Sequence, residues 1–251
     1  MVVYPPDEWT LREKICEIGR LMRQYNYAEG TSGNISARID SERVLCTPSG
    51  LAKGHMTPDQ LIVVNMDGEK IGPHNPANRD LRPTSEILMH LECYRQRSDV
   101  NGVVHAHPPT AVALTCVGVS LEQCILPEVV IMLGLVPTAP YATPCGAEDR
   151  DSVCELIADH DAIMLANHGS LTLGRDVWTA YLRLEVLEHF ANVLYRTHQL
   201  GGAKPLPFDE VDKLLELRHR IGLGHPNDEE LFHEWYDSIR YRYDYFRVSA
   251  G

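Results

Sequence analysis

The spacing of apolar and polar residues changes along the chain, and it predicts a mixture of helices and short strands. Apolar residues recur every three or four positions over residues 9–25 and 177–198, so both segments are predicted to be amphipathic helices. A third helix is predicted to start at Thr84, a plausible N-cap after Pro83, because Ile87, Leu91 and Tyr94 follow at helical spacing. Further helices are predicted over residues 110–117, 148–159 and 209–220.

Short apolar runs bounded by turn residues predict the strands. They lie at residues 44–47, 61–65, 103–107, 129–135, 136–141 and 162–166, and the turn-rich run 30–36 leads into another strand-like sequence. Residues 72–83 are predicted to be a polar loop, and residues 235–246 form an aromatic segment near the C-terminus. Mixed short strands and helices without an internal repeat favour one α/β or α+β domain with a core sheet.

Composition and charge narrow the class of protein. The 251 residues are 44% apolar and 23% charged, as in an ordinary globular domain, and the net charge of −12 argues against nucleic acid as a partner. Apolar runs are too short to span a membrane, and Met1 to Asp7 lack the pattern of a signal peptide. Seven scattered cysteines without a C-x-x-C pair indicate reduced thiols. We therefore expect a cytoplasmic protein that does not associate with membranes.

The segment around two alternating histidines suggests a metal site. His105 and His107 follow Val103 and Val104, and residues i and i+2 of a strand point to the same face, about 7 Å apart at ~3.3 Å per residue. Two histidines at a strand end can also simply bond to backbone or solvent. A third histidine, His168, follows a short apolar run downstream, and three imidazoles with an open position are typical of a catalytic metal site. Zinc suits these ligands, and the affinity order also permits manganese, cobalt or nickel.

Glu86 is the candidate acid–base group. At the start of the predicted helix, its ionised form would be favoured by the helix dipole, and that alone is a sufficient structural explanation. Beside a metal-bound substrate, the same carboxylate could instead take a proton from carbon or oxygen.

Three short segments could bind an anion through neutral donors. Gly30-Thr31-Ser32-Gly33-Asn34 and Thr47-Pro48-Ser49-Gly50 offer hydroxyls, backbone N–H groups and glycines, and Thr84-Ser85 precedes a predicted helix. Each segment alone would be an ordinary turn or cap. Together they describe a phosphate pocket that needs no lysine cluster.

These motifs occur in the same order in the class II aldolase/adducin head family, and over residues 8–200 the chain resembles its L-fuculose-phosphate aldolase type. The resemblance implies an α/β/α sandwich around a central, largely antiparallel sheet. It also implies a homotetramer with active sites between subunits. Residues 1–251 would form a single domain of this family, with residues 201–251 as a helical and aromatic C-terminal extension.

The resemblance also implies roles for individual residues. His105, His107 and His168 would ligate Zn²⁺ (or Mn²⁺ or Co²⁺), and Glu86 would be the catalytic acid–base group. The positions that would hold the substrate phosphate are Thr31, Gly33, Asn34, Ser49, Gly50, Thr84 and Ser85. The family's tyrosine proton donor would fall near residues 126–130, where this chain has none; Glu128 is the nearest ionisable residue, and Tyr141 is interpreted as structural.

The implied function is a metal-dependent aldolase that cleaves a phosphorylated ketose, similar to L-fuculose 1-phosphate, to dihydroxyacetone phosphate and an aldehyde. The alternatives within the family are a sugar-phosphate 4-epimerase and a thioribulose-phosphate dehydratase, which product analysis would distinguish. A third alternative is a non-catalytic interaction module like the adducin head, although such a module would need no open metal site.

Overall fold

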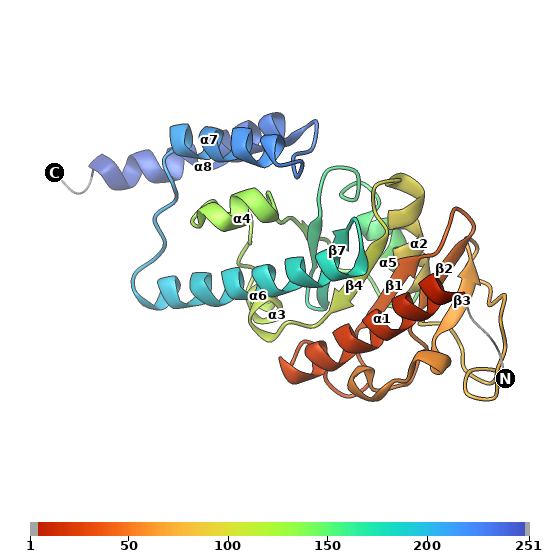
Figure 1. The fold of residues 1–251 in the computed structure, drawn as a ribbon. Helices are drawn as coiled ribbons and strands as arrows, with labels where there is room; N and C mark the ends of the chain where they lie inside the picture. The colour runs from red at the N-terminus through yellow and green to blue at the C-terminus, as the bar shows by residue number, and fades with distance from the viewer. Residues whose placement is uncertain (1–4, 249–251) are drawn as a thin grey trace.

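A seven-stranded sheet forms the centre of the computed structural model, which describes residues 5–248 (Figure 1). Every neighbouring pair of strands is antiparallel except β5 and β6, which are parallel. The prediction of a largely antiparallel sheet is therefore confirmed. Across the sheet the strands follow the order β3 (Ile62–Asn65), β2 (Arg43–Cys46), β1 (Asn34–Arg38), β4 (Gly102–Ala106), β7 (Gly169–Gly174), β6 (Ala162–Leu165) and β5 (Thr138–Ala139).

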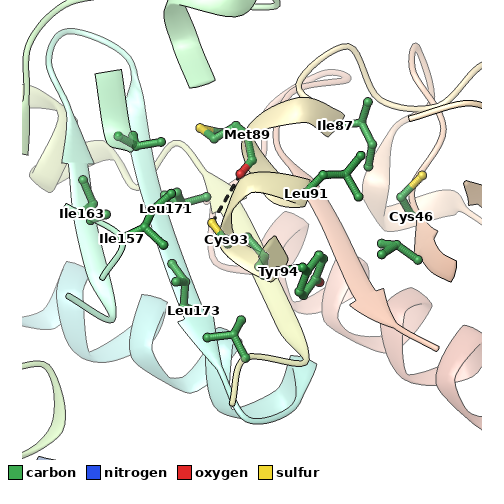
Figure 2. Packing of buried hydrophobic residues seen from close by; sticks show 14 of the residues in the cluster. Cys46, Ile87, Met89, Leu91, Cys93, Tyr94, Ile157, Ile163, Leu171 and Leu173 are labelled. Atoms are coloured by element: carbon green, nitrogen blue, oxygen red, sulfur yellow. Dashed lines mark hydrogen bonds between the residues drawn. The ribbon is translucent and has the colours of Figure 1, made fainter. Parts of the chain in front are cut away.

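Helices cover both faces of this sheet, as Figure 1 shows. One face packs against α1 (Pro6–Gln24), the N-terminal half of α6 (Val177–Gln199) and, over β6, α3 (Pro109–Cys116). The other face packs against α2 (Ile87–Gln96) and α5 (Ala147–Val153). Figure 2 shows this second layer, in which Leu91 and Cys93 of α2 belong to the same apolar cluster as Leu171 and Leu173 of β7. The predicted α/β/α sandwich is confirmed.

Alternation along β4 decides which layer each of its side chains enters. Val103 belongs to the apolar cluster beneath α2 and α5, whereas Val104 and Ala106 belong to the cluster beneath α1 and α6. Because alternate residues of a strand share a face, His105 points to the same side as Val103, toward the beginning of α2.

The C-terminal helices form an additional layer outside α4 (Pro127–Met132). Val130 of α4 packs against Val211 and Leu215 of α7 (Phe208–Arg220) and Phe232 of α8 (Asp228–Val248). In Figure 1 this helical pair lies on the far side of α4 from the sheet. The helix predicted over residues 209–220 is confirmed by α7. The aromatic segment 235–246 lies in α8, and its side chains from residue 240 onward lie outside the described residues.

Several predicted elements differ from the structure. Residues 129–135 were expected to be extended, but α4 covers Pro127–Met132, with Pro127 in its first turn. Its valines are buried on two sides, Val129 toward α6 and Val130 toward α7, and a short apolar run of this kind has no period that separates strand from helix. The predicted N-cap at Thr84 is wrong, because α2 begins at Ile87 with Glu86 as its N-cap residue.

Other differences concern element lengths and one unpredicted strand. Of the strand expected over residues 136–141, only Thr138–Ala139 (β5) forms a strand. The helix expected over residues 148–159 is shorter, because α5 ends at Val153. Strand β7 was not predicted. Its sequence, Gly-Ser-Leu-Thr-Leu-Gly, lacks the bulky β-branched residues that usually mark a buried strand, yet all six residues are buried.

Two expectations drawn from composition can be compared with the structure. Among the helices described, none combines the length and apolar character needed to cross a membrane. All seven cysteines are free thiols.

Candidate active site

Two histidine rings meet at the end of β4 with their Nε2 atoms facing each other. His105 Nδ1 donates to the carbonyl oxygen of Ser170 at 3.0 Å, and His107 Nδ1 donates to Glu29 Oε1 at 3.1 Å. Carbonyl and carboxylate oxygens only accept, so both Nε2 atoms carry lone pairs when the rings are neutral. The Nε2 atoms lie 3.2 Å apart. Two nitrogen ligands on a tetrahedral ion with ~2.0–2.1 Å bonds would lie about 3.4 Å apart, so this pair fits a divalent metal.

His168, the third histidine, reaches the same point from the turn between β6 and β7. Its ring centroid lies 4.8 Å from that of His105 and 5.2 Å from that of His107. One nitrogen from each of the three rings lies within 4.8 Å of the other two. The structure thus brings together the three histidines that the sequence suggested, including His168, which lies more than sixty residues downstream.

Burial favours the metal-binding form of two of these rings, His105 and His168. Desolvation, with smaller contributions from His107 and His168, holds the pKa of His105 well below its usual value. Burial likewise lowers the pKa of His168, although the Glu86 carboxylate opposes this effect. Neutral imidazole is the metal-binding form, so His105 and His168 need to lose few protons to accept a divalent ion.

Gly169 allows the turn and the end of β4 to approach so closely. A Cβ atom at this position would lie 2.5 Å from the carbonyl oxygen of Ala106 and 2.9 Å from both His105 Cε1 and His107 Cδ2. Asn167, two residues earlier, has a φ of 57°, a left-handed conformation that asparagine adopts more readily than most residues. The sequence Asn167-His168-Gly169 is therefore matched to the sharp turn that presents His168.

We expect Gly169→Ala to weaken metal binding more than it disturbs the rest of the fold. The added methyl must push β4 and β7 apart or displace the two imidazoles, and such overpacking typically costs about 1–3 kcal/mol. Metal titration of the purified variant should show a loss of affinity of ten-fold or more. Gly50→Ala is a suitable control, because a Cβ atom added there would meet no other atom within 4 Å, although its φ of 76° adds local strain. Wild-type metal affinity in Gly169→Ala would contradict the close packing described here.

Glu86 faces the three histidines from the N-terminal end of α2. Its Oε1 lies 3.3 Å from His168 Nε2, and its Oε2 lies 3.5 Å from His105 Nε2. Asn34 Nδ2 donates to Oε2 at 2.6 Å, whereas Oε1 is buried and has no hydrogen-bond partner. A buried carboxylate oxygen without a partner is unfavourable, so a group that contacts Oε1 would be stabilised there. Suitable partners are a metal ion, a proton or a substrate hydroxyl.

The three candidate anion-binding segments lie side by side next to Glu86. The backbone N–H of Ser49 donates to the carbonyl oxygen of Arg82, and that of Thr84 donates to the carbonyl oxygen of Thr47. Asn34 is tied to Glu86 by its side chain, and Gly33 has a φ of 70°. Thr31, Ser49, Gly50 and Ser85 are exposed, whereas Gly33, Asn34 and Thr84 are buried. The three segments are therefore adjacent to one another beside Glu86, the arrangement that one shared anion-binding site would require.

Sequence reasoning missed three ionisable residues of this region. Glu29 orients His107, Asp149 lies in the first turn of α5, and the buried Lys53 Nζ bonds to the Thr31 carbonyl oxygen. One carboxylate oxygen of Asp149 lies within 4.8 Å of ligand atoms of Glu86 and His168, and burial, followed by Glu86, raises its pKa to about 6. None of these residues belongs to a recognisable motif, so only the fold reveals them.

The two residues considered in place of the missing tyrosine lie on the surface of this chain. Glu128 is exposed in the first turn of α4, and Tyr141 is 64% exposed after β5. Neither residue belongs to the cluster of Glu86 and the histidines within the chain.

Comparison with known proteins agrees with the geometry of the site. The model of the class II aldolase and adducin N-terminal domain matches residues 13–195. The chain is 32% identical to 3-oxo-tetronate 4-phosphate decarboxylase of Escherichia coli (strain K12), over 84% of this chain and 96% of that protein. It is 34% identical to an L-fuculose phosphate aldolase of Methanococcus maripaludis (strain DSM 14266), over 74% and 96%. The crystal structure of YgbL from Escherichia coli superimposes with a TM-score of 0.75 at 31% identity, covering 82% of this chain and 98% of that one.

The matched residues include every candidate ligand and anion-binding segment, and they end before α7 and α8. The order of motifs, the sandwich fold and the similarity to these proteins agree with one another. This chain is a member of the class II aldolase and adducin N-terminal domain family.

Proposed function

We propose that this protein is a metal-dependent lyase that cleaves a carbon–carbon bond of a phosphorylated sugar derivative and releases dihydroxyacetone phosphate. The observation that carries the proposal is the unpartnered Oε1 of Glu86, which faces three inward-pointing imidazoles. The first candidate reaction is aldol cleavage of a ketose 1-phosphate similar to L-fuculose 1-phosphate, by analogy with the methanococcal relative.

The residues fit a divalent metal held by His105, His107 and His168. Zn²⁺ is the preferred ion for three nitrogen ligands, with Mn²⁺ or Co²⁺ as alternatives. When bound, the ion would supply positive charge that stabilises the oxygen anion formed as the carbon–carbon bond breaks. Glu29, which holds His107 at 3.1 Å, would fix the orientation of the most exposed of the three rings.

Glu86 is proposed as the catalytic acid–base group. Asn34 holds one carboxylate oxygen, which leaves Oε1 to deliver a proton to the carbon released by cleavage, or to remove that proton in the condensation direction. The substrate phosphate is proposed to bind among the residues already described: Thr31, Gly33, Asn34, Ser49, Gly50, Thr84 and Ser85.

A second candidate is decarboxylation, because the decarboxylase of Escherichia coli is also similar over nearly the whole of its length. A 3-oxo-tetronate 4-phosphate carries its carboxyl group on the carbon next to the ketone. Loss of carbon dioxide from it leaves the same enediolate of dihydroxyacetone phosphate that aldol cleavage leaves. Protonation of this enediolate is therefore common to both candidates, and only the group that departs differs.

The test is product analysis with a panel of ketose 1-phosphates and 3-oxo-tetronate 4-phosphate. We expect dihydroxyacetone phosphate to appear, the activity to disappear after chelation and to return with Zn²⁺. An aldehyde as the second product assigns an aldolase, and carbon dioxide assigns a decarboxylase. One isomeric product would indicate an epimerase, and loss of water a dehydratase. If no substrate reacts and no solvent deuterium enters dihydroxyacetone phosphate, the proposed lyase is wrong.

We also propose a cytoplasmic homotetramer with active sites at subunit interfaces, as the family resemblance implies. The free state of all seven cysteines is compatible with a reducing compartment. Sedimentation of the purified protein would measure the number of subunits directly.

A further inference from the structure

Lys53 is the first residue of the short 3₁₀ helix η1 (Lys53–His55), and its side chain is directed into the protein. Only 3% of the residue is exposed. The backbone of η1 lies tightly against α1, since a Cβ atom on Gly19 would come within 2.4 Å of the Lys53 carbonyl oxygen. The position from which this lysine side chain extends is therefore fixed by packing.

The ammonium group connects the two loops that border the proposed phosphate pocket. Lys53 Nζ donates to the carbonyl oxygen of Thr31 at 2.7 Å and to that of Leu51 at 2.8 Å. Thr31 belongs to the segment that ends at Asn34, and Leu51 directly follows Ser49 and Gly50. An ammonium group has three N–H donors, so one of them is not used by these two bonds.

The charge of this group is not balanced by the contacts that hold it. Both carbonyl partners are neutral, and among the described residues no carboxylate lies within ion-pair distance of Nζ. Burial lowers the pKa of Lys53 to about 8, and the more distant Glu86 offsets this only in part. A buried cation without a counter-ion is unfavourable, so an anion brought between the two loops would be stabilised by it and would stabilise it in return.

We propose that Lys53 is a positioning residue for the substrate phosphate: it holds the 30–34 and 47–51 loops together and supplies the positive charge for a phosphate monoester dianion. This inference rests on the proposed function, because it names the residue that supplies positive charge to the same proposed phosphate pocket. It also changes the expectation of a purely neutral pocket, in which Thr31, Ser49 and their neighbours would provide hydrogen bonds alone.

The experiment measures the affinity for glycerol 3-phosphate, an unreactive phosphate ester, by calorimetry. Lys53→Met should bind about ten- to a hundred-fold more weakly than wild type, as expected for loss of a charged hydrogen-bonding partner. KM for the phosphorylated substrate should rise by a similar factor with little change in kcat. Solvent exchange into unphosphorylated dihydroxyacetone should lose much less than exchange into dihydroxyacetone phosphate, because the unphosphorylated compound has no phosphate to bind.

Lys70→Met is the matched control. Lys70 also holds a loop by donating to carbonyl oxygens, those of Asn78, Arg79 and Leu81, but this loop lies outside the proposed pocket. Both substitutions remove a loop-holding ammonium and should lower the melting temperature. Only Lys53→Met should lower the affinity for glycerol 3-phosphate.

A second measurement keeps the test decisive even if Lys53→Met does not fold. The ester is already a dianion above pH about 7, since its second pKa is about 6. Wild-type affinity should therefore fall as the pH rises through 8, where free Lys53 loses its proton, and Lys53→Arg should remove this fall because guanidinium stays charged. A flat wild-type profile, or equal affinity in wild type and Lys53→Met, overturns the role of Lys53. Failure of the wild type to bind any phosphate ester would overturn the phosphorylated substrate itself, and with it this inference.

Discussion

Glu86→Gln is expected to lower kcat by about 10²–10⁴-fold while the fold and most of the metal are retained. Glutamine preserves the shape of the side chain, and its amide oxygen can still accept the hydrogen bond that Asn34 donates to Glu86 Oε2. The three imidazoles remain in place. What is lost is a group at the Oε1 position that can accept and return a proton, so kcat should change more than KM.

Solvent-proton exchange into dihydroxyacetone phosphate is the most direct readout for this variant. It requires no second product, so it is the same measurement for an aldolase and for a decarboxylase. Wild-type protein should exchange the proton, and Glu86→Gln should not. Exchange at the wild-type rate would mean that Glu86 is only the N-cap residue of α2.

Glu188→Gln is a matched control for this experiment. Glu188 has the same exposed fraction as Glu86, 8%, and its carboxylate accepts hydrogen bonds from the backbone N–H groups of Thr110 and Ala111. These bonds stabilise the first turn of α3. Replacing this buried carboxylate should therefore lower the melting temperature, with only a few-fold effect on exchange.

His107→Ala is expected to abolish metal-dependent turnover and most of the bound metal. The substitution removes one of the two Nε2 atoms that lie 3.2 Å apart, and His105 and His168 alone leave an incomplete set of ligands. Elemental analysis of the purified variant should find far less than one ion per chain. Stoichiometric metal with full activity would remove His107 from the set of ligands.

Two further variants separate loss of the metal from general damage. Glu29→Gln keeps the imidazole but weakens the carboxylate contact that orients it, so metal affinity should fall by about 10–100-fold rather than disappear. His189→Ala replaces an exposed histidine of α6 and should leave metal content unchanged. A graded series of this kind would not arise if the histidines served only to pack the end of β4.

The sequence was most informative where one local rule decided the structure. Alternation in a strand placed His105 and His107 on a common face, and helical spacing located α1, α6 and α7 with small errors at their ends. The extended segment predicted over residues 129–135 was wrong, because a short buried apolar run has no period that distinguishes a strand from a helix such as α4. Strand β7 was not predicted because its first residues, Gly169 and Ser170, are small. Their small size allows β7 to lie close to β4, and this need is visible only in the folded protein.

The residues of the candidate site likewise fall into two groups, those that the sequence suggests and those that only the fold reveals. Motif order led to the three histidines, Glu86 and the candidate anion-binding segments, since the chemistry proposed for them is visible in the residue types. Asp149 and Lys53 could not be found in this way, because each is an unremarkable residue in a local pattern that has other uses. Their positions depend on contacts made by α5 and η1 across the fold, and neither contact leaves a signal along the chain.

The pairing register of β4 has a consequence for how this protein can change during evolution. Val103 and His105 face α2, whereas Val104 and Ala106 face α1 and α6, and this assignment depends only on counting residues along the strand. Exchanging one valine for isoleucine would keep the assignment. Deleting a single residue between Gly102 and His105 would turn the histidine toward the opposite layer, even though every residue of the site was still present. In this strand, length should be under stricter selection than the identity of the apolar side chains.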